Sequence, residues 1–226
     1  MFEKFRRYNQ IEDLEQDFKY ANIRSNDRDR RSKINIAVID DEPFKAEYNL
    51  RNVGYKINYL GDVKDLSDVA SYPIVLCDLQ GVGRQMDSRK QGAFIIDELK
   101  RNHPEKFVVA YTGGAADDGI TIHAQEYADF FIKKDADIEE WRDKLDQIIN
   151  LLSNPIEVWR RQRQALIDYD VSTLTILKLE DAYVKSIKTQ NDEPYRHFIN
   201  TYKAGQDVRA IAQSLIASGI FELMKG

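Results

Sequence analysis

Three aspartates stand directly after short apolar runs of the sequence. Asp40 and Asp41 follow the β-branched run 34–39, and Asp78 follows the run 73–77. If the fold brings these carboxylates together, they repel one another and need a counter-charge to stay ionised. Mg²⁺ would supply it, because this cation accepts one or two carboxylates together with waters and a phosphoryl oxygen. A carboxylate in such a site can itself attack phosphorus and form an aspartyl phosphate.

A hydroxyl group and two ammonium groups follow two further apolar runs. Thr112 comes after 107–111, and Lys133 and Lys134 come after 130–132. A phosphoryl group in transfer needs its oxygens neutralised by a metal, a lysine and hydrogen-bond donors. These residue types therefore favour phosphoryl transfer to an aspartate, provided that the four runs end at one place in the fold.

The order of the segments predicts a sheet that brings these ends together. Fully apolar strands separated by helical patterns indicate a parallel sheet covered on both faces, an α/β fold. Right-handed crossovers then give a doubly wound sheet of five strands, and its functional groups gather at the carboxyl ends of the strands. The expected strands are 34–39, 55–60, 73–77, 107–111 and 130–132, and the expected helices are 43–53, 63–71, 93–100, 118–127 and 137–152.

The N-terminal zone, residues 1–33, is strongly charged and precedes a domain that we place at 34–152. Ile11, Leu14 and Phe18 fall at helical spacing, which predicts a short amphipathic helix. The basic run 24–33 is interpreted as a solvated linker, because acids dilute its charge.

The C-terminal zone, residues 153–226, contains no convincing strand. Asn154 followed by Pro155 is typical of a helix start. Interleaved apolar residues predict a small helical bundle or an extension that packs against something else. The further expected helices are 172–189, 194–203 and 206–223.

Composition excludes several classes of protein. The net charge of −5 provides no whole-chain attraction to nucleic acid. A single cysteine, Cys77, excludes an internal disulfide and a cysteine-based zinc site. No apolar run is long enough to span a bilayer and no signal peptide is present, so the expected location is the cytoplasm.

Four stretches of the chain resemble the receiver domains of response regulators. The resemblance covers about half the chain, from 34 to 152, and implies a flavodoxin-like sheet with strand order 2-1-3-4-5. It also implies a histidine kinase or phosphotransfer protein as partner, and Mg²⁺ as cofactor. The matching stretches are 36–43, 73–79, 108–113 and 128–134.

The resemblance assigns roles to the acidic residues. Asp78 matches the phosphoacceptor. Asp40 and Asp41 match the pair that holds the metal, with Asp41 the better candidate for a direct ligand. The backbone carbonyl of Gln80 matches the third protein ligand.

The remaining roles fall on the last two apolar runs of the domain and the residues that follow them. Thr112 matches the hydroxyl residue that senses the phosphoryl group, and Gly113 matches the small residue that leaves room for it. Lys134 matches the invariant lysine, and Phe131 matches the switching aromatic.

The chain departs from the family pattern in two places that bear on the site. Asp135 stands where the family has a proline, which leaves Lys133 open as the alternative to Lys134. The loop 79–91 is longer than usual and lacks its usual proline, so it is a candidate for covering the site or binding a partner.

The leading hypothesis is a phosphoacceptor that signals through 153–226, by binding another protein or a second copy, rather than an enzyme. A pseudo-receiver that binds partners without phosphorylation is the alternative. A DNA-binding effector is disfavoured, since 153–226 holds ten basic residues against nine acidic ones. A hydrolase with an aspartyl nucleophile usually needs an acid two residues later, where this chain has Gln80.

Overall fold

The computed structural model describes residue 11, residues 27–114, 119–201 and 205–217, and residue 221. The amphipathic helix expected around Ile11, Leu14 and Phe18 lies outside the described residues, apart from Ile11 itself. Ile11 is buried among the residues of the core.

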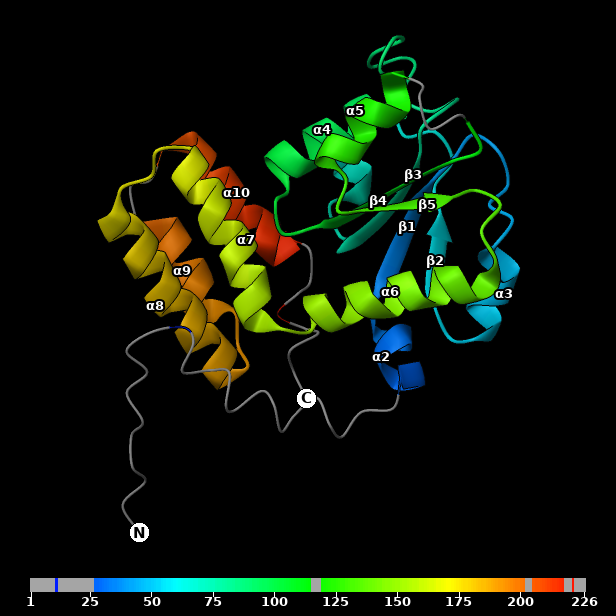
Figure 1. Ribbon diagram of the computed structural model, residues 1–226. Coiled ribbons are helices and arrows are strands. Elements are labelled where there is room, and N and C mark those ends of the chain that lie inside the picture. Colours follow the sequence, from blue (N-terminus) through cyan, green and yellow to red (C-terminus); the bar gives the residue numbers. More distant parts are fainter. Residues whose placement is uncertain (1–10, 12–26, 115–118, 202–204, 218–220, 222–226) are drawn as a thin grey trace.

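Five parallel strands form one sheet, shown in Figure 1. All neighbouring pairs run parallel, and the strand order is β2-β1-β3-β4-β5. The predicted fold class and strand order are therefore confirmed. The strands are β1 (Asn35–Ile39), β2 (Lys56–Tyr59), β3 (Ile74–Asp78), β4 (Phe107–Thr112) and β5 (Phe130–Lys133).

Helices cover both faces of the sheet because side chains on a strand alternate between the faces. In β1, Ile36 and Val38 belong to one apolar cluster, whereas Ala37 and Ile39 belong to the other. The first cluster takes in α3 (Glu47–Asn52) and α6 (Ile138–Leu152). The second takes in the 3₁₀ helix η3 (Leu66–Val69), α4 (Gly92–Asn102) and α5 (Gly119–Tyr127).

Two of the expected helices are shorter than their patterns suggested. The segment 43–53 becomes helical only at Glu47, after a turn in which the N–H of Glu47 donates to the carbonyl of Phe44. The segment 63–71 forms only η3, where the Asp65 side chain accepts from the N–H of Ser67.

In the part of the chain that the structure describes, four helices follow the sheet and pack beside it, as Figure 1 shows; we call them the helical region. The first begins as expected, with the Asn154 side chain accepting from the N–H groups of Ile156 and Glu157. Trp159 stacks on Tyr183 with 5.1 Å between ring centroids. The helices are α7 (Pro155–Asp168), α8 (Thr173–Thr189), α9 (Glu193–Thr201) and α10 (Gln206–Ala217).

A partly buried charge cluster joins the helical region to the sheet. Arg161 of α7 donates to both carboxylate oxygens of Asp129, at 2.9 and 3.1 Å, just before β5. It also donates to the carbonyls of Pro104 and Lys106. Lys100 of α4 completes the cluster, with its Nζ 2.8 Å from Asp129 Oδ1.

A second contact, which is fully buried, involves Glu105, the residue between Pro104 and Lys106. The hydroxyl of Ser214 in α10 donates to Glu105 Oε2 over 2.8 Å, two residues before β4 begins. Both contacts therefore join the helical region to the loops that lead into β4 and β5, at the amino ends of these strands.

The interpretation of 24–33 as a solvated linker was wrong for the residues that the structure describes. Residues Asp27–Lys33 form helix α2, and Arg31 is buried. Arg31 pairs with Asp146 of α6 and donates to the carbonyl of Val53. A partner 115 residues away turns a locally polar segment into a packed helix.

Among the described residues, no helix combines the length and the apolar character that crossing a membrane requires.

Candidate functional site

The carboxyl ends of β1 and β3 bring three acids together. Asp40 and Asp41 follow β1, and Asp78 is the last residue of β3. Each of the three offers a carboxylate oxygen, and these oxygens all lie within 4.8 Å of one another. The convergence expected from the parallel sheet is present.

Lys134, directly after β5, is the lysine that reaches the acids. Its Nζ lies 2.7 Å from Asp78 Oδ2 and 3.2 Å from Asp40 Oδ2. The exposed Glu42 is 3.9 Å away. Lys133 is exposed and has no ion pair with any described residue. Lys134 occupies this place although Asp135, not proline, follows it.

Asp78 is almost fully buried, and both of its oxygens have partners. Oδ1 accepts from the N–H of Leu79 at 2.7 Å and from the N–H of Gln80 at 3.4 Å. Oδ2 accepts from Lys134. Burial raises the pKa of Asp78 above its ordinary value, against the opposing effect of Lys134.

The pKa of Lys134 is also raised. Burial alone would lower it, but the hydrogen bonds and charges of Asp78 and Asp40 outweigh that effect. The lysine therefore carries its positive charge in the site.

Asp40 is held in place by hydrogen bonds that local sequence patterns did not reveal. The hydroxyl of Tyr111, on β4, donates to Asp40 Oδ2 over 2.7 Å. The N–H of Glu42 donates to Oδ1 at 2.9 Å, and the hydroxyl of Tyr59 donates to the backbone carbonyl of Asp40 at 2.8 Å. In the sequence, only the presence of a hydroxyl on the otherwise apolar run 107–111 could have indicated that Tyr111 contacts the site.

Asp41 differs from Asp40 in being exposed. Among the described residues, no hydrogen bond or ion pair engages its carboxylate. It packs against the backbone of Gly81, whose φ of +88° places it in the left-handed region. A Cβ at this position would overlap the Asp41 carboxylate, so the glycine leaves the space in which that carboxylate lies.

Hydrogen bonds within the loop 79–91 and to Asp62 hold this loop in place. Gln91 Oε1 accepts from the N–H of Gly81 at 2.9 Å, and Asp62 Oδ1 accepts from the N–H of Gly83 at 2.7 Å. Gly92 lies so close to the backbone of Asp78 that a Cβ there would overlap the Asp78 carbonyl oxygen. The loop thus packs beneath the acids as an ordered part of the site.

Thr112 and its neighbours form the opposite side of the site. Thr112 is buried, and its Oγ1 accepts from the N–H of Gly114 at 3.0 Å. Its carbonyl accepts from the N–H of Lys134 at 2.9 Å, which links the ends of β4 and β5. Gly113 has open space around its Cα, because a Cβ there would meet only Lys134 Cβ, at 3.9 Å. Phe131 is half-buried against the α4–α5 face.

The donor set suits a hard divalent cation. Three carboxylates face one ammonium group, which leaves an excess of two negative charges if all are ionised. All the candidate ligand atoms are oxygens, the type that Mg²⁺ prefers. Asp40 already accepts from Tyr111 and Lys134, whereas the exposed Asp41 keeps its oxygens available.

Comparisons with solved structures return receiver domains at low sequence identity. A CheY-like receiver domain protein from Methanospirillum hungatei is 14% identical, with a TM-score of 0.43, over 52% of this chain and 94% of its own. The receiver domain of a response regulator from Bacteroides fragilis is 21% identical, with a TM-score of 0.41, over 51% and 97%. The response regulator TrrA from Thermotoga maritima, in complex with Mg²⁺ and beryllium fluoride, is 18% identical, with a TM-score of 0.39, over 51% and 98%.

The sheet resembles that of receiver domains. No protein-family model matches the chain, and no curated protein matches it. Strand order 2-1-3-4-5 is also that of flavodoxin and CheY, so the topology itself carries the assignment of the fold. Function has to be argued from the site.

A hollow of about 490 Å³ adjoins the acid site. It shares Thr112 and Lys134 with the site and extends over the ends of β4 and β5. The residues that line it are Lys45, Thr112, Gly113, Gly114, Phe131, Lys133, Lys134 and Asp135.

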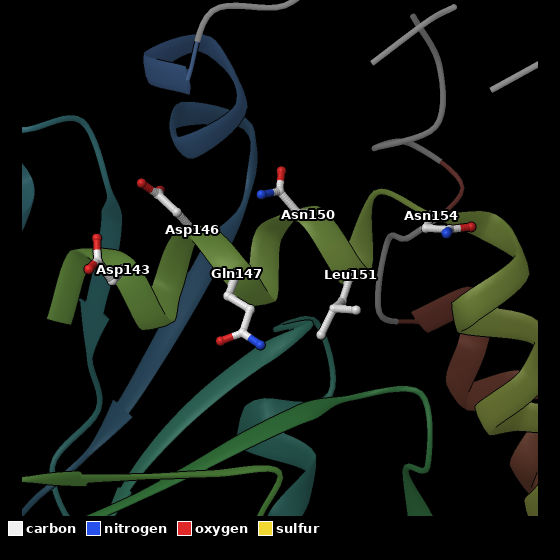
Figure 2. Close-up of a pocket in the computed structure, with 6 residues that line it drawn as sticks. All are labelled: Asp143, Asp146, Gln147, Asn150, Leu151 and Asn154. Carbon is white, nitrogen blue, oxygen red and sulfur yellow. The ribbon is translucent and has the colours of Figure 1, made fainter. Parts of the chain in front are cut away.

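A second hollow, of about 450 Å³, lies on α6 and is drawn in Figure 2. Figure 2 shows Asp146 and Asn150 pointing toward α2, whereas Gln147 and Leu151 lie on the other side of the helix. Asp146 and Asn150 are engaged by Arg31 and Arg30 of α2. Asp146 therefore serves the packing of α2 on α6.

Proposed function

We propose that this chain is a receiver-type signalling protein that accepts a phosphoryl group on Asp78 from a histidine kinase or phosphotransfer partner, with Mg²⁺. The observation that supports it best is the contact between Lys134 Nζ and Asp78 Oδ2 within a cluster of three acids. A structural ion pair would need only one carboxylate. Three carboxylates around one lysine favour a site that awaits further positive charge.

The residues of the chain suit the steps of such a transfer. One oxygen of Asp78 attacks phosphorus, while the backbone N–H of Leu79 keeps the carboxylate oriented. Asp41, Asp78 and the carbonyl of Gln80 would hold Mg²⁺, and Asp40 would support this acidic site. The bound cation would neutralise phosphoryl oxygens. Lys134 can pass from Asp78 Oδ2 to a phosphoryl oxygen, since the same ammonium group can pair with either anion.

Thr112 would complete the response. Its hydroxyl now accepts from Gly114 and still carries a proton to donate. If this hydroxyl rotated toward a phosphoryl oxygen, it would pull the end of β4 toward that oxygen. The half-buried Phe131 lies on the neighbouring strand β5. This is the proposed switching role of Thr112 and Phe131.

The helical region is the proposed output. Strand β5 has Lys134 of the site at one end and Asp129, bound by Arg161 of α7, at the other. A change in the position of Lys134 would therefore reach the contact with α7 through a single short strand. The partner of this region would be another protein or a second copy of the chain.

Phosphorylation of the whole chain tests the proposal. With Mg²⁺ and phosphoramidate, we expect one phosphorylated species on a phosphate-affinity gel, sensitive to hydroxylamine as acyl phosphates are. The Asp78→Asn variant should give none, and omission of Mg²⁺ should abolish the reaction. Label on the Asp78→Asn variant at the wild-type level, or none on the wild type, would contradict the proposal.

The alternative is a pseudo-receiver that binds partners without being phosphorylated. Asp135 in place of proline and the long loop 79–91 favour it, because both alter the surroundings of the site. In that case, Asp78 would stay unmodified by every donor while partner binding persisted. Location in the cytoplasm remains a prediction of the sequence.

A further inference from the structure

The hollow beside the acids carries positive charge that the site itself does not use. Its lining includes three lysines and one aspartate, Asp135. Lys134 is already paired with Asp78 and Asp40. Lys45, after β1, and Lys133, at the end of β5, are both exposed, and neither forms an ion pair or a side-chain hydrogen bond with any residue that the structure describes.

The hollow and the acid site share residues. Thr112 and Lys134 belong to both, and Gly113, which has open space around its Cα, lines the hollow beside them. When the phosphoryl group of a donor lies at Asp78, the rest of the donor molecule can therefore occupy the hollow. The half-buried ring of Phe131 adds an apolar wall.

We propose that this hollow binds the leaving group of an acyl phosphate, with Lys45 and Lys133 stabilising the carboxylate as it departs. The proposal rests on the proposed function of Asp78 and adds a class of phosphodonor. An oxygen of Asp78 bonds to phosphorus, the bond between phosphorus and the acyl oxygen breaks, and the acid leaves with the electron pair as a carboxylate. No proton, oxidant or reductant is needed.

The charge of the leaving group decides which donors gain from these lysines. A departing carboxylate is anionic, so two nearby ammonium groups stabilise the transition state in which its charge develops. A departing amine or imidazole is neutral or cationic and gains nothing. The lysines should therefore favour acyl phosphates over donors with a phosphorus–nitrogen bond.

Initial rates of Asp78 phosphorylation with acetyl phosphate and with phosphoramidate test this preference. In the double variant Lys45→Gln/Lys133→Gln, we expect the acetyl phosphate rate to fall about three- to ten-fold, the range for two exposed charge pairs. The phosphoramidate rate should change less than about two-fold. Lys56→Gln is the matched control, since Lys56 is exposed at the start of β2, at the opposite edge of the sheet.

A binding measurement gives a readout that does not depend on turnover. Nuclear magnetic resonance titration with phosphonoacetate, which carries a carboxylate beside its phosphonate, should shift the amides of Gly113, Gly114 and Lys133. Methylphosphonate, which lacks the carboxylate, should bind more weakly to the wild type. The double variant should bind the two probes equally.

The outcomes separate the two proposals. Equal slowing of both donors, or no slowing of either, with Asp78 still labelled, would overturn the leaving-group site alone. Failure of both donors to label the wild type would instead contradict phosphorylation of Asp78, and the leaving-group site with it.

Discussion

At the scale of single residues, Gly81 shows how a backbone position shapes the acid site. Its positive φ and its contact with Asp41 mean that the loop and the exposed carboxylate share one small space. Because Asp41 has no hydrogen bond to hold it among the described residues, packing against Gly81 is what limits where its carboxylate lies.

Replacing Gly81 with alanine should displace Asp41 and weaken Mg²⁺ binding. Displacing a metal ligand through its support typically lowers metal affinity by about ten-fold or more. Isothermal titration of the whole chain with Mg²⁺ measures this. Gly61→Ala is the matched control, because Gly61 also has a positive φ (+71°) but nothing within 4 Å of a Cβ. Both variants should lose about 1–3 kcal/mol of stability from backbone strain, and only Gly81→Ala should lose Mg²⁺ affinity. Equal Mg²⁺ affinities in the two variants would refute this role of Gly81.

Local patterns revealed part of the site and missed the rest for a physical reason. Asp78 and Lys134 were predictable because each ends an apolar run, and parallel strands place such ends side by side. Tyr111 was not, because its hydroxyl reaches Asp40 across two strand spacings, between residues 71 apart in the sequence.

At the scale of elements, the partly buried charges around Asp129 join three parts of the fold. Arg161 of α7 and Lys100 of α4 both pair with its carboxylate, and the N–H of Val108 donates to it at 2.8 Å. Burial would raise the pKa of Asp129, but the two cations outweigh it and lower the pKa below its ordinary value. The ionised carboxylate is therefore the form that stabilises the fold.

The sign of the pH dependence follows from this lowered pKa. The contribution of Asp129 is fully present above the pKa of an unfolded aspartate, about 3.9, and is lost as the pH falls through the lower folded value. Asp129→Asn should cost about 1.5–3 kcal/mol at pH 7, because it leaves two partly buried cations without their anion. In urea denaturation between pH 3 and 7, the free energy of unfolding of Asp129→Asn should fall less steeply toward acid than that of the wild type.

Asp168→Asn serves as the control for this measurement. Asp168 is exposed at the end of α7, and its carboxylate accepts a hydrogen bond from the side chain of Gln164 on the same helix. A loss as large as that of Asp129→Asn would show that the effect is not specific to the partly buried cluster.

Elements, like residues, were predictable where the signals are local. Helix α7 begins where Asn154 and Pro155 indicated, because the capping bond forms within three residues. Helix α2 was missed because its stability comes from Asp146, which lies in α6. The same holds for Arg161, whose partner Asp129 lies 32 residues away and outside α7.

At the scale of the whole molecule, the acid site and the helical region lie at opposite ends of the strands. The site is at the carboxyl ends of β1, β3, β4 and β5, whereas Arg161 and Ser214 contact the loops before β4 and β5. Any signal from Asp78 to α7 must therefore run along the strands or through the helices that cover them.

Arg161→Gln should separate phosphorylation from its effect on the helical region. In the wild type, we expect Mg²⁺ with beryllofluoride to change hydrogen exchange in α7, measured by mass spectrometry. In Arg161→Gln that change should be reduced at least about five-fold, while Asp78 is phosphorylated at the wild-type rate, since Arg161 touches no residue of the site. Arg160→Gln, at an exposed neighbour, is the control. An unchanged α7 response in Arg161→Gln would exclude this route.

The edge position of β5 has a mechanical consequence. Among the described residues, β4 is its only partner in the sheet, and no ladder of backbone hydrogen bonds from them lies on its other side. A strand bound on one side has fewer hydrogen bonds to break when it slides along its axis than a central strand has. Because Lys134 pairs with Asp78 after one end of β5 and Asp129 pairs with Arg161 before the other, a displacement of Lys134 along the strand axis would be passed on to Arg161.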